Sequence, residues 1–191
     1  HEHRHASSRY LSALSRHHAD FIKDQYHKIS RSIINYCMEH HASTLVLGEN
    51  KRWKQDCDMG SQNNQNFVSM PTGLLKQMII YKASDAGIKT IMQEESYTSQ
   101  ADITAMDYIP VYGVDAENAV FSGRRINRSL YRCFNGMIIN ADCNGAANIM
   151  RKAITDAWNS ITDFSFLASP EVSGFHELNP LSISVKGIAA A

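Results

Sequence analysis

Three carboxylates that could bind a metal ion lie in two short segments of the chain. Asp142 stands in the first turn of a predicted helix, directly after a short predicted strand at 137–139. The partial positive charge of a helix N-terminus favours a carboxylate there, and carboxylate oxygens bind hard cations such as Mg²⁺. The small residues that follow, Gly145 and Ala146 among them, would let this helix lie close to a sheet. We therefore expect Asp142 at a sheet edge; the plainer alternative is a capping aspartate with no further role.

Glu94 and Glu95 follow the predicted strand 88–93 directly. Successive side chains of a strand point to opposite faces, so only one of the two can share a metal site with Asp142. We predict Glu95 as that ligand, then Glu94, and then Glu49 after the strand at 44–48. The alternative is an ordinary solvated strand end.

Two basic clusters could contact a phosphate backbone. One surrounds an aromatic ring, and the other lies in the segment 97–139. Positive charge beside an aromatic ring suits phosphates and a stacked base, although a solvated surface fits the composition equally well. The residues are Lys51, Arg52, Trp53 and Lys54 in the first cluster, and Arg124, Arg125, Arg128 and Arg132 in the second.

Composition bounds the class of protein. The chain has 191 residues, 43% of them hydrophobic, which fits one globular domain with a core. Nineteen basic residues balance nineteen acidic ones, which argues against a large basic footprint. The four scattered cysteines suit a reducing cytosol, so we expect a cytoplasmic protein. The polar start shows no secretory signal, and no apolar run approaches the roughly 20 residues of a membrane helix.

The elements that must position these residues alternate between helices and strands. Apolar periodicity predicts one long helix or two joined ones over 8–41, a buried strand at 44–48, and a helix from Pro71 to Asp85 closed by Gly87. A strand at 88–93 follows, and the helix that carries Asp142 is predicted to end near Trp158. This order predicts an α/β layer fold with a mainly parallel sheet.

The segment 97–139 lacks a strong period until it reaches a predicted β-hairpin. Residues 130–134 and 137–139 flank Asn135-Gly136, a strong hairpin-turn signal. We expect this hairpin and the packing of Phe121, Tyr131 and Phe134 to hold the segment together. Residues 159–191 are Ser-rich and are predicted to form a poorly ordered tail.

Several of these segments, taken in order, resemble the middle of TnpB-type (OrfB) proteins. They read LGENKRWKQ at 47–55, NNQNFV at 63–68, YKA at 81–83, EESYTS at 94–99 and NADCNG at 140–145. The family comprises transposon-encoded, RNA-guided DNA nucleases related to the type V CRISPR effectors. The resemblance covers 8–155 and rests on the ordered set, because no single motif is specific. It implies a RuvC-type, RNase H-like fold, two Mg²⁺ ions held by carboxylates, and DNA and guide RNA as partners.

The chain departs from this family at the catalytic positions. The family's first catalytic Asp lies on a strand before the long helix, and this chain begins at that helix. Many members carry Glu after the next apolar strand, at the position where this chain has Gly48. One branch of the family resembles this chain, with Gly at that position and Glu in a Glu-Ser-Tyr-Thr-Ser segment on the neighbouring strand. The resemblance therefore predicts an incomplete RuvC-like domain at 8–158, with an insertion at 97–139 in place of the zinc-binding segment.

Zinc is not expected in that insertion. Most relatives carry two C-x-x-C pairs there, but Ala101-Asp102-Ile103 replaces the first pair and only Cys133 lies near the second. A structural zinc site needs four ligands.

The expected protein is a C-terminal fragment of a transposon-associated RNA-guided DNA endonuclease, catalytically incomplete alone. We expect weak or absent Mg²⁺ binding, and self-association through an exposed sheet edge. The alternatives are a nuclease completed by a second chain, a non-catalytic nucleic-acid-binding or regulatory module, and a decayed transposase remnant.

Overall fold

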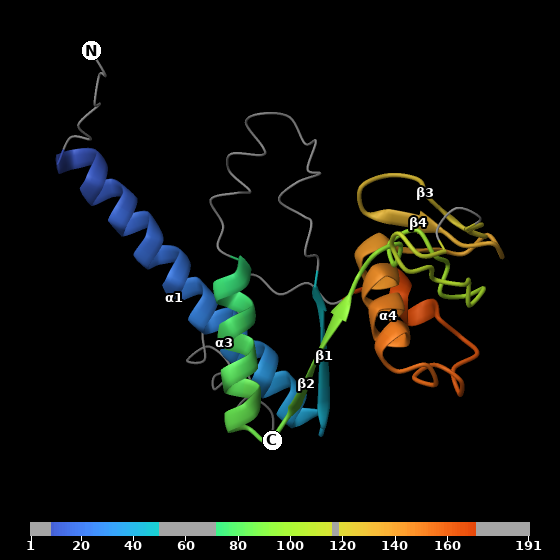
Figure 1. Cartoon of the computed structure of the whole chain (residues 1–191), viewed down its shortest axis with the longest axis horizontal. Coiled ribbons are helices and arrows are strands. Elements are labelled where there is room, and N and C mark those ends of the chain that lie inside the picture. Colours follow the sequence, from blue (N-terminus) through green and yellow to red (C-terminus); the bar gives the residue numbers. More distant parts are fainter. Residues whose placement is uncertain (1–8, 50–71, 116–118, 171–191) are drawn as a thin grey trace, which may run out of the picture. The chain divides into compact units, whose positions relative to one another are not determined.

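The computed structural model describes residues 9–49, 72–115 and 119–170 (Figure 1). These residues belong to two compact units. The described part of the first unit is a pair of helices. The second unit contains the strands, the remaining helix and the segment that follows it.

The helix pair consists of α1 (Arg9–Glu39) and α3 (Thr72–Asp85), which pack against each other. The predicted long helix is thus one continuous helix. It buries Tyr26, Ser30, Ile34 and Cys37, whose spacing of three or four residues places them on one face. Beyond α3, Gly87 has a φ of 72°, the left-handed conformation that favours glycine after a helix, so the predicted helix end is confirmed. No helix among the described residues is long and apolar enough to cross a membrane.

A buried lysine fixes how these two helices meet. Lys82 of α3 is 4% exposed, and its ammonium group donates hydrogen bonds to the His27 carbonyl (2.7 Å) and the Ser30 hydroxyl (2.6 Å) of α1. The Ser30 hydroxyl donates in turn to the Tyr26 carbonyl. Burial, with the positive charge of Arg31, lowers the pKa of Lys82. The helix pair therefore has one register in which this ammonium group is satisfied.

The second unit begins with two parallel strands, β1 (Thr44–Glu49) and β2 (Lys89–Glu94). Their register runs from Thr44 beside Lys89 to Glu49 beside Glu94, so both strands end at the same edge. This confirms the predicted parallel pair. Helix α4 (Ala141–Ala153) contacts both strands.

A second, antiparallel sheet contains β3 (Arg124–Arg125), β4 (Leu130–Arg132) and β5 (Ile138–Asn140). Strands β4 and β5 form the predicted hairpin, and Gly136 takes a φ of 85° in its turn. The α/β class is confirmed with a small parallel sheet, and three of the five described strands form the separate antiparallel sheet that contains the hairpin.

The core of this unit includes residues that were predicted to lie in a tail. Phe164 and Leu167, the latter in the 3-10 helix η2 (Ser165–Ala168), pack in one cluster with Tyr131, Ile139 and Ala147. Helix α4 ends at Ala153, not near Trp158. The Trp158 indole donates a hydrogen bond to the Ala147 carbonyl (2.9 Å), so the segment after α4 packs back against this helix. Of the predicted tail, 171–191 lies outside the described residues.

Candidate nucleic-acid and metal site

Asp142 lies in the first turn of α4, but Asn140 is the capping residue. The Asn140 side-chain oxygen accepts hydrogen bonds from the backbone N–H groups of Asp142 (2.9 Å) and Cys143 (3.0 Å). The Asp142 side chain is 85% exposed and accepts a hydrogen bond from the Arg125 guanidinium at 3.2 Å. Asp142 therefore lies beside β3, an edge strand of its sheet, but its side chain is exposed to solvent.

Two buried asparagines of α4 fasten the chain that follows β2. Asn144 donates to the Ala101 carbonyl (2.8 Å) and accepts from the Ile103 N–H (3.2 Å). Asn148 donates to the carbonyls of Thr98 (3.0 Å) and Ala101 (2.7 Å). Both asparagines are fully buried. These two residues were not predicted from the sequence, although their spacing of four residues places two amides on one face of a helix rich in small residues.

The Glu95 carboxylate fills space that Gly48 leaves open. A Cβ atom placed on Gly48 would lie 2.5 Å from Glu95 Oε2 and 3.0 Å from Ile149 Cδ1. Gly48 stands near the end of β1, and Ile149 lies on α4 two turns after Asp142. A carboxylate from the segment after β2 therefore lies where a side chain at position 48 would begin.

Glu94 is bound to the other end of α4. Its carboxylate accepts hydrogen bonds from the Lys152 ammonium group (2.6 Å) and the Ser96 N–H (2.6 Å). Burial alone would raise the pKa of Glu94, but these partners lower it overall. The structure thus pairs Glu94 with the last turn of α4, whereas Asp142 lies in the first. Glu49, the third choice, ends β1 beside Glu94.

The described residues do not fit a complete metal centre. Among them, no three or more histidines, cysteines or carboxylates form a group that could hold a metal ion. A two-metal nuclease site needs several carboxylates around ions about 4 Å apart. Glu95 and Asp142 stay the predicted ligands, but by themselves they do not supply such a site.

Two buried aspartates lie in the segment 97–139. Asp102 accepts hydrogen bonds from the N–H groups of Thr104 (2.9 Å) and Phe134 (2.7 Å). Asp107 accepts from the Asp102 N–H (2.9 Å) and from the Ser122 hydroxyl (2.6 Å). These carboxylates tie the start of the insertion to its middle and to the β4–β5 turn.

The aromatic residues predicted to pack the insertion differ in burial. Tyr131 is fully buried, as predicted, and Phe121 is half-buried. Phe134 is 61% exposed, so its predicted packing role is wrong. Cys133 is a buried free thiol, and burial raises its pKa to about 11.

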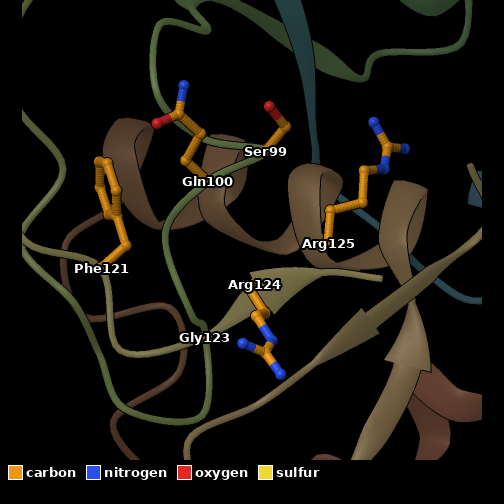
Figure 2. Close-up of a pocket in the computed structure, with 6 residues that line it drawn as sticks. All are labelled: Ser99, Gln100, Phe121, Gly123, Arg124 and Arg125. Atoms are coloured by element: carbon orange, nitrogen blue, oxygen red, sulfur yellow. The ribbon is translucent and has the colours of Figure 1, made fainter. Parts of the chain in front are cut away.

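A pocket of about 270 Å³ opens beside β3 (Figure 2). Arg124 and Arg125 are consecutive on this strand and point to opposite sides, and Arg125 reaches Asp142. Arg128 is exposed between β3 and β4. The pocket is lined by Ser99, Gln100, Phe121, Gly123, Arg124 and Arg125. The other predicted cluster, Lys51, Arg52, Trp53 and Lys54, lies outside the described residues.

Part of the chain is similar in sequence to known proteins. Residues 73–149 match the family described as Cas12f1-like, TNB domain. A CRISPR-associated endodeoxyribonuclease Cas12f1 from Sulfoacidibacillus thermotolerans is 31% identical over 132 residues, which cover 69% of this chain and 27% of that protein. The chain therefore spans about a quarter of this curated relative's length.

A solved structure shares the fold. The cryo-EM structure of the Cas12f1–sgRNA–target DNA complex superposes with a TM-score of 0.58 at 17% identity, over 76% of this chain and 38% of that one. The chain thus has an α/β fold similar to that of Cas12f1. Together with the sequence matches, this supports a TnpB/Cas12f-related family for the chain.

The contact between Gly48 and Glu95 can be measured as a coupling energy. Gly48→Val should lower the free energy of unfolding by about 1–2 kcal/mol, because the new side chain meets the Glu95 carboxylate and Ile149. In a Glu95→Ala background the loss should shrink by about 1 kcal/mol, measured by chemical denaturation. Glu94→Ala is the matched control and should show no coupling. Additive effects of Gly48→Val and Glu95→Ala would contradict the contact.

The insertion should depend on its buried aspartates and not on zinc. Asp102→Ala leaves the N–H groups of Thr104 and Phe134 without their acceptor and should cost about 2–4 kcal/mol of unfolding free energy. Asp156→Ala, at an exposed aspartate, should change it by less than about 0.5 kcal/mol. A chelator should leave the melting temperature of the wild-type chain unchanged. A chelator-induced drop would reveal a structural metal ion.

Proposed function

We propose that this chain is the C-terminal RuvC-like segment of a TnpB-type (OrfB) RNA-guided DNA endonuclease, and that it binds DNA and guide RNA. One observation carries the proposal: the arginine-lined pocket, formed by residues between 99 and 125, falls inside the 73–149 match to the Cas12f1-like TNB domain. The similar proteins also support nucleic-acid binding, since one is an endodeoxyribonuclease and the other forms a complex with sgRNA and target DNA.

The charge of the β3–β4 region supports nucleic-acid binding. Four arginines between 124 and 132 are exposed, within a chain whose formal net charge is zero. Guanidinium groups bind phosphates through two parallel hydrogen bonds and stack on flat rings. A local basic surface on a neutral chain favours a specific contact with a nucleic-acid strand over general attraction to polyanions.

The proposed catalytic residues are Asp142 and Glu95, with Glu94 the weaker choice. Glu95 is preferred because its carboxylate lies over Gly48 at the end of β1, whereas the Glu94 carboxylate is held by Lys152 and Ser96. Because the described residues supply no full ligand set, we propose that the isolated chain binds Mg²⁺ weakly or not at all and is catalytically incomplete. Zinc is not part of this proposal.

We also propose self-association through the parallel sheet. Among the described residues, β2 has one hydrogen-bonded neighbouring strand, β1, so its other edge is the one that we propose pairs with a second chain. Such edges are templates for pairing with another chain. Sedimentation velocity at rising protein concentration tests this, and a monomer at every concentration would refute it.

Nucleic-acid binding should depend on the arginines and on salt. Replacing Arg124, Arg125 and Arg128 together by Gln should weaken binding of a short DNA duplex and flatten the slope of log affinity against log salt by about 2–3, because each phosphate contact contributes about 0.9. Lys89→Gln is the control, since Lys89 is exposed at the opposite end of β2 from Glu94. Fluorescence anisotropy measures both. An unchanged slope in the triple variant would refute the arginine surface.

A non-catalytic nucleic-acid-binding or regulatory module is the second candidate function. It is favoured by the ion pairs that occupy two of the three predicted catalytic carboxylates, Asp142 with Arg125 and Glu94 with Lys152. Under either candidate, the purified chain with Mg²⁺ or Mn²⁺ should not cut single- or double-stranded DNA. Cleavage that is lost in Asp142→Ala would contradict both the second candidate and the proposed incompleteness.

A further inference from the structure

The dipeptide Asn-Gly occurs twice in the chain, at 135–136 and at 144–145. Asparagine is among the chemically labile residues of proteins. It is most labile before glycine, because a following residue without a Cβ atom lets its backbone nitrogen approach the asparagine side chain. Both pairs share this chemistry, so the structure around each pair decides whether it reacts.

The first pair lies in the exposed turn between β4 and β5, where residues 134–136 are all exposed. The Gly136 N–H donates a hydrogen bond to the Cys133 carbonyl (3.0 Å), and the Asn135 side-chain oxygen accepts one from the Met137 N–H (3.0 Å). These two bonds at the surface hold the turn. Opening an exposed loop tip costs far less free energy than unfolding the molecule, so the Gly136 nitrogen is released at intervals.

The second pair is held inside helix α4. Asn144 is fully buried, donates to the Ala101 carbonyl (2.8 Å) and accepts from the Ile103 N–H (3.2 Å). Gly145 is also buried, and its nitrogen belongs to the helix backbone. A reaction at Asn144 therefore needs α4 to unwind and the buried amide to lose its partners.

We propose that Asn135 is a site of spontaneous covalent modification and that the fold protects Asn144 from the same reaction. Hydroxide removes the proton of the Gly136 nitrogen, which then attacks Asn135 Cγ. A bond forms between this nitrogen and Cγ and closes a cyclic imide, while the bond from Cγ to the amide nitrogen breaks and ammonia leaves. Water opens the imide at either carbonyl and gives aspartate or isoaspartate. No oxidant, reductant or cofactor is consumed.

The isoaspartate product changes the insertion beyond the turn itself. The neighbouring Phe134 N–H donates to the buried Asp102 carboxylate (2.7 Å), and the Cys133 N–H donates to the Met137 carbonyl (2.8 Å). Isoaspartate routes the main chain through the side-chain carbon, which lengthens the turn by a methylene group and shifts the groups that make these bonds. It therefore destabilises the insertion, whereas aspartate leaves the length of the main chain unchanged.

The test compares the two asparagines within one sample. The full chain is incubated at mildly alkaline pH below its melting temperature, and in parallel in denaturant. Proteolysis and mass spectrometry then measure the conversion of amide to acid at each position. In denaturant, both asparagines should convert at similar rates. In the folded chain, Asn135 should convert about a hundredfold or more faster than Asn144, which corresponds to an opening free energy lower by about 2.8 kcal/mol.

Variants at position 135 separate the chemistry from its effect on stability. Asn135→Gln keeps an amide but would have to close a larger ring, so it should stay unmodified during the same incubation. Asn135→Asp supplies the aspartate product directly and should melt close to the wild type. The isoaspartate fraction of the aged wild-type chain, separated by ion exchange, should melt below both.

Three results would overturn the inference. If Asn135 stays an amide in the folded chain while it converts in denaturant, the turn protects it. If Asn135 and Asn144 convert equally fast in the folded chain, unfolding of the whole unit and not the exposed turn controls the reaction. If the isoaspartate fraction melts with the wild type, the turn absorbs the added methylene. None of these results bears on the proposed function, because no nucleic acid enters the measurement.

Discussion

The hydrogen bonds from the buried amides of Asn144 and Asn148 are the contacts on which the second unit depends. They hold the carbonyls of Thr98 and Ala101 and the N–H of Ile103 against α4. Unpaired backbone groups in that position would be costly to bury, so the segment has one arrangement. That arrangement follows Tyr97, whose φ is 62°, and places Ser99 and Gln100 at the pocket. One face of α4 thereby holds the first residues of the insertion.

In the insertion, hydrogen bonds to two carboxylates join segments that lie far apart in the sequence. Asp102 and Asp107 are buried, and charge-assisted bonds from backbone N–H groups are among the stronger ones available. The Arg151 guanidinium lies nearby and donates to the Asp107 backbone carbonyl at 2.6 Å. Burial lowers the pKa of Arg151, and the negative charges of Asp107 and Asp102 oppose that shift. A half-buried cation thus lies near the two carboxylates.

Local signals in the sequence predicted the helices and strands, whereas contacts between residues far apart in the chain determine the geometry of the site. Asn135-Gly136 gave the hairpin and Gly87 the end of α3, because each depends on a few neighbouring residues. Other contacts depend on residues far apart in the chain. Phe164 packs against α4, Glu94 pairs with Lys152, and Tyr97 stacks against Tyr112 and Phe121. Periodicity cannot supply such contacts, which is also why α4 was extended to Trp158 and Phe134 was placed in the core. The division into two units likewise depends on tertiary packing.

The carboxylates predicted to be catalytic differ in how firmly the structure holds them. Lys152 is only 11% exposed, and Ser96 adds a second hydrogen bond, so Glu94 is fixed in a structural contact. The Arg125–Asp142 pair is open to water, with side chains 45% and 85% exposed, and such surface pairs contribute about 0–1 kcal/mol. A phosphate near Arg125 could compete for the guanidinium at little cost and leave the Asp142 carboxylate unpaired. Arg125 therefore connects the pocket to Asp142, whereas the Glu95 carboxylate lies beside Gly48 at the end of β1.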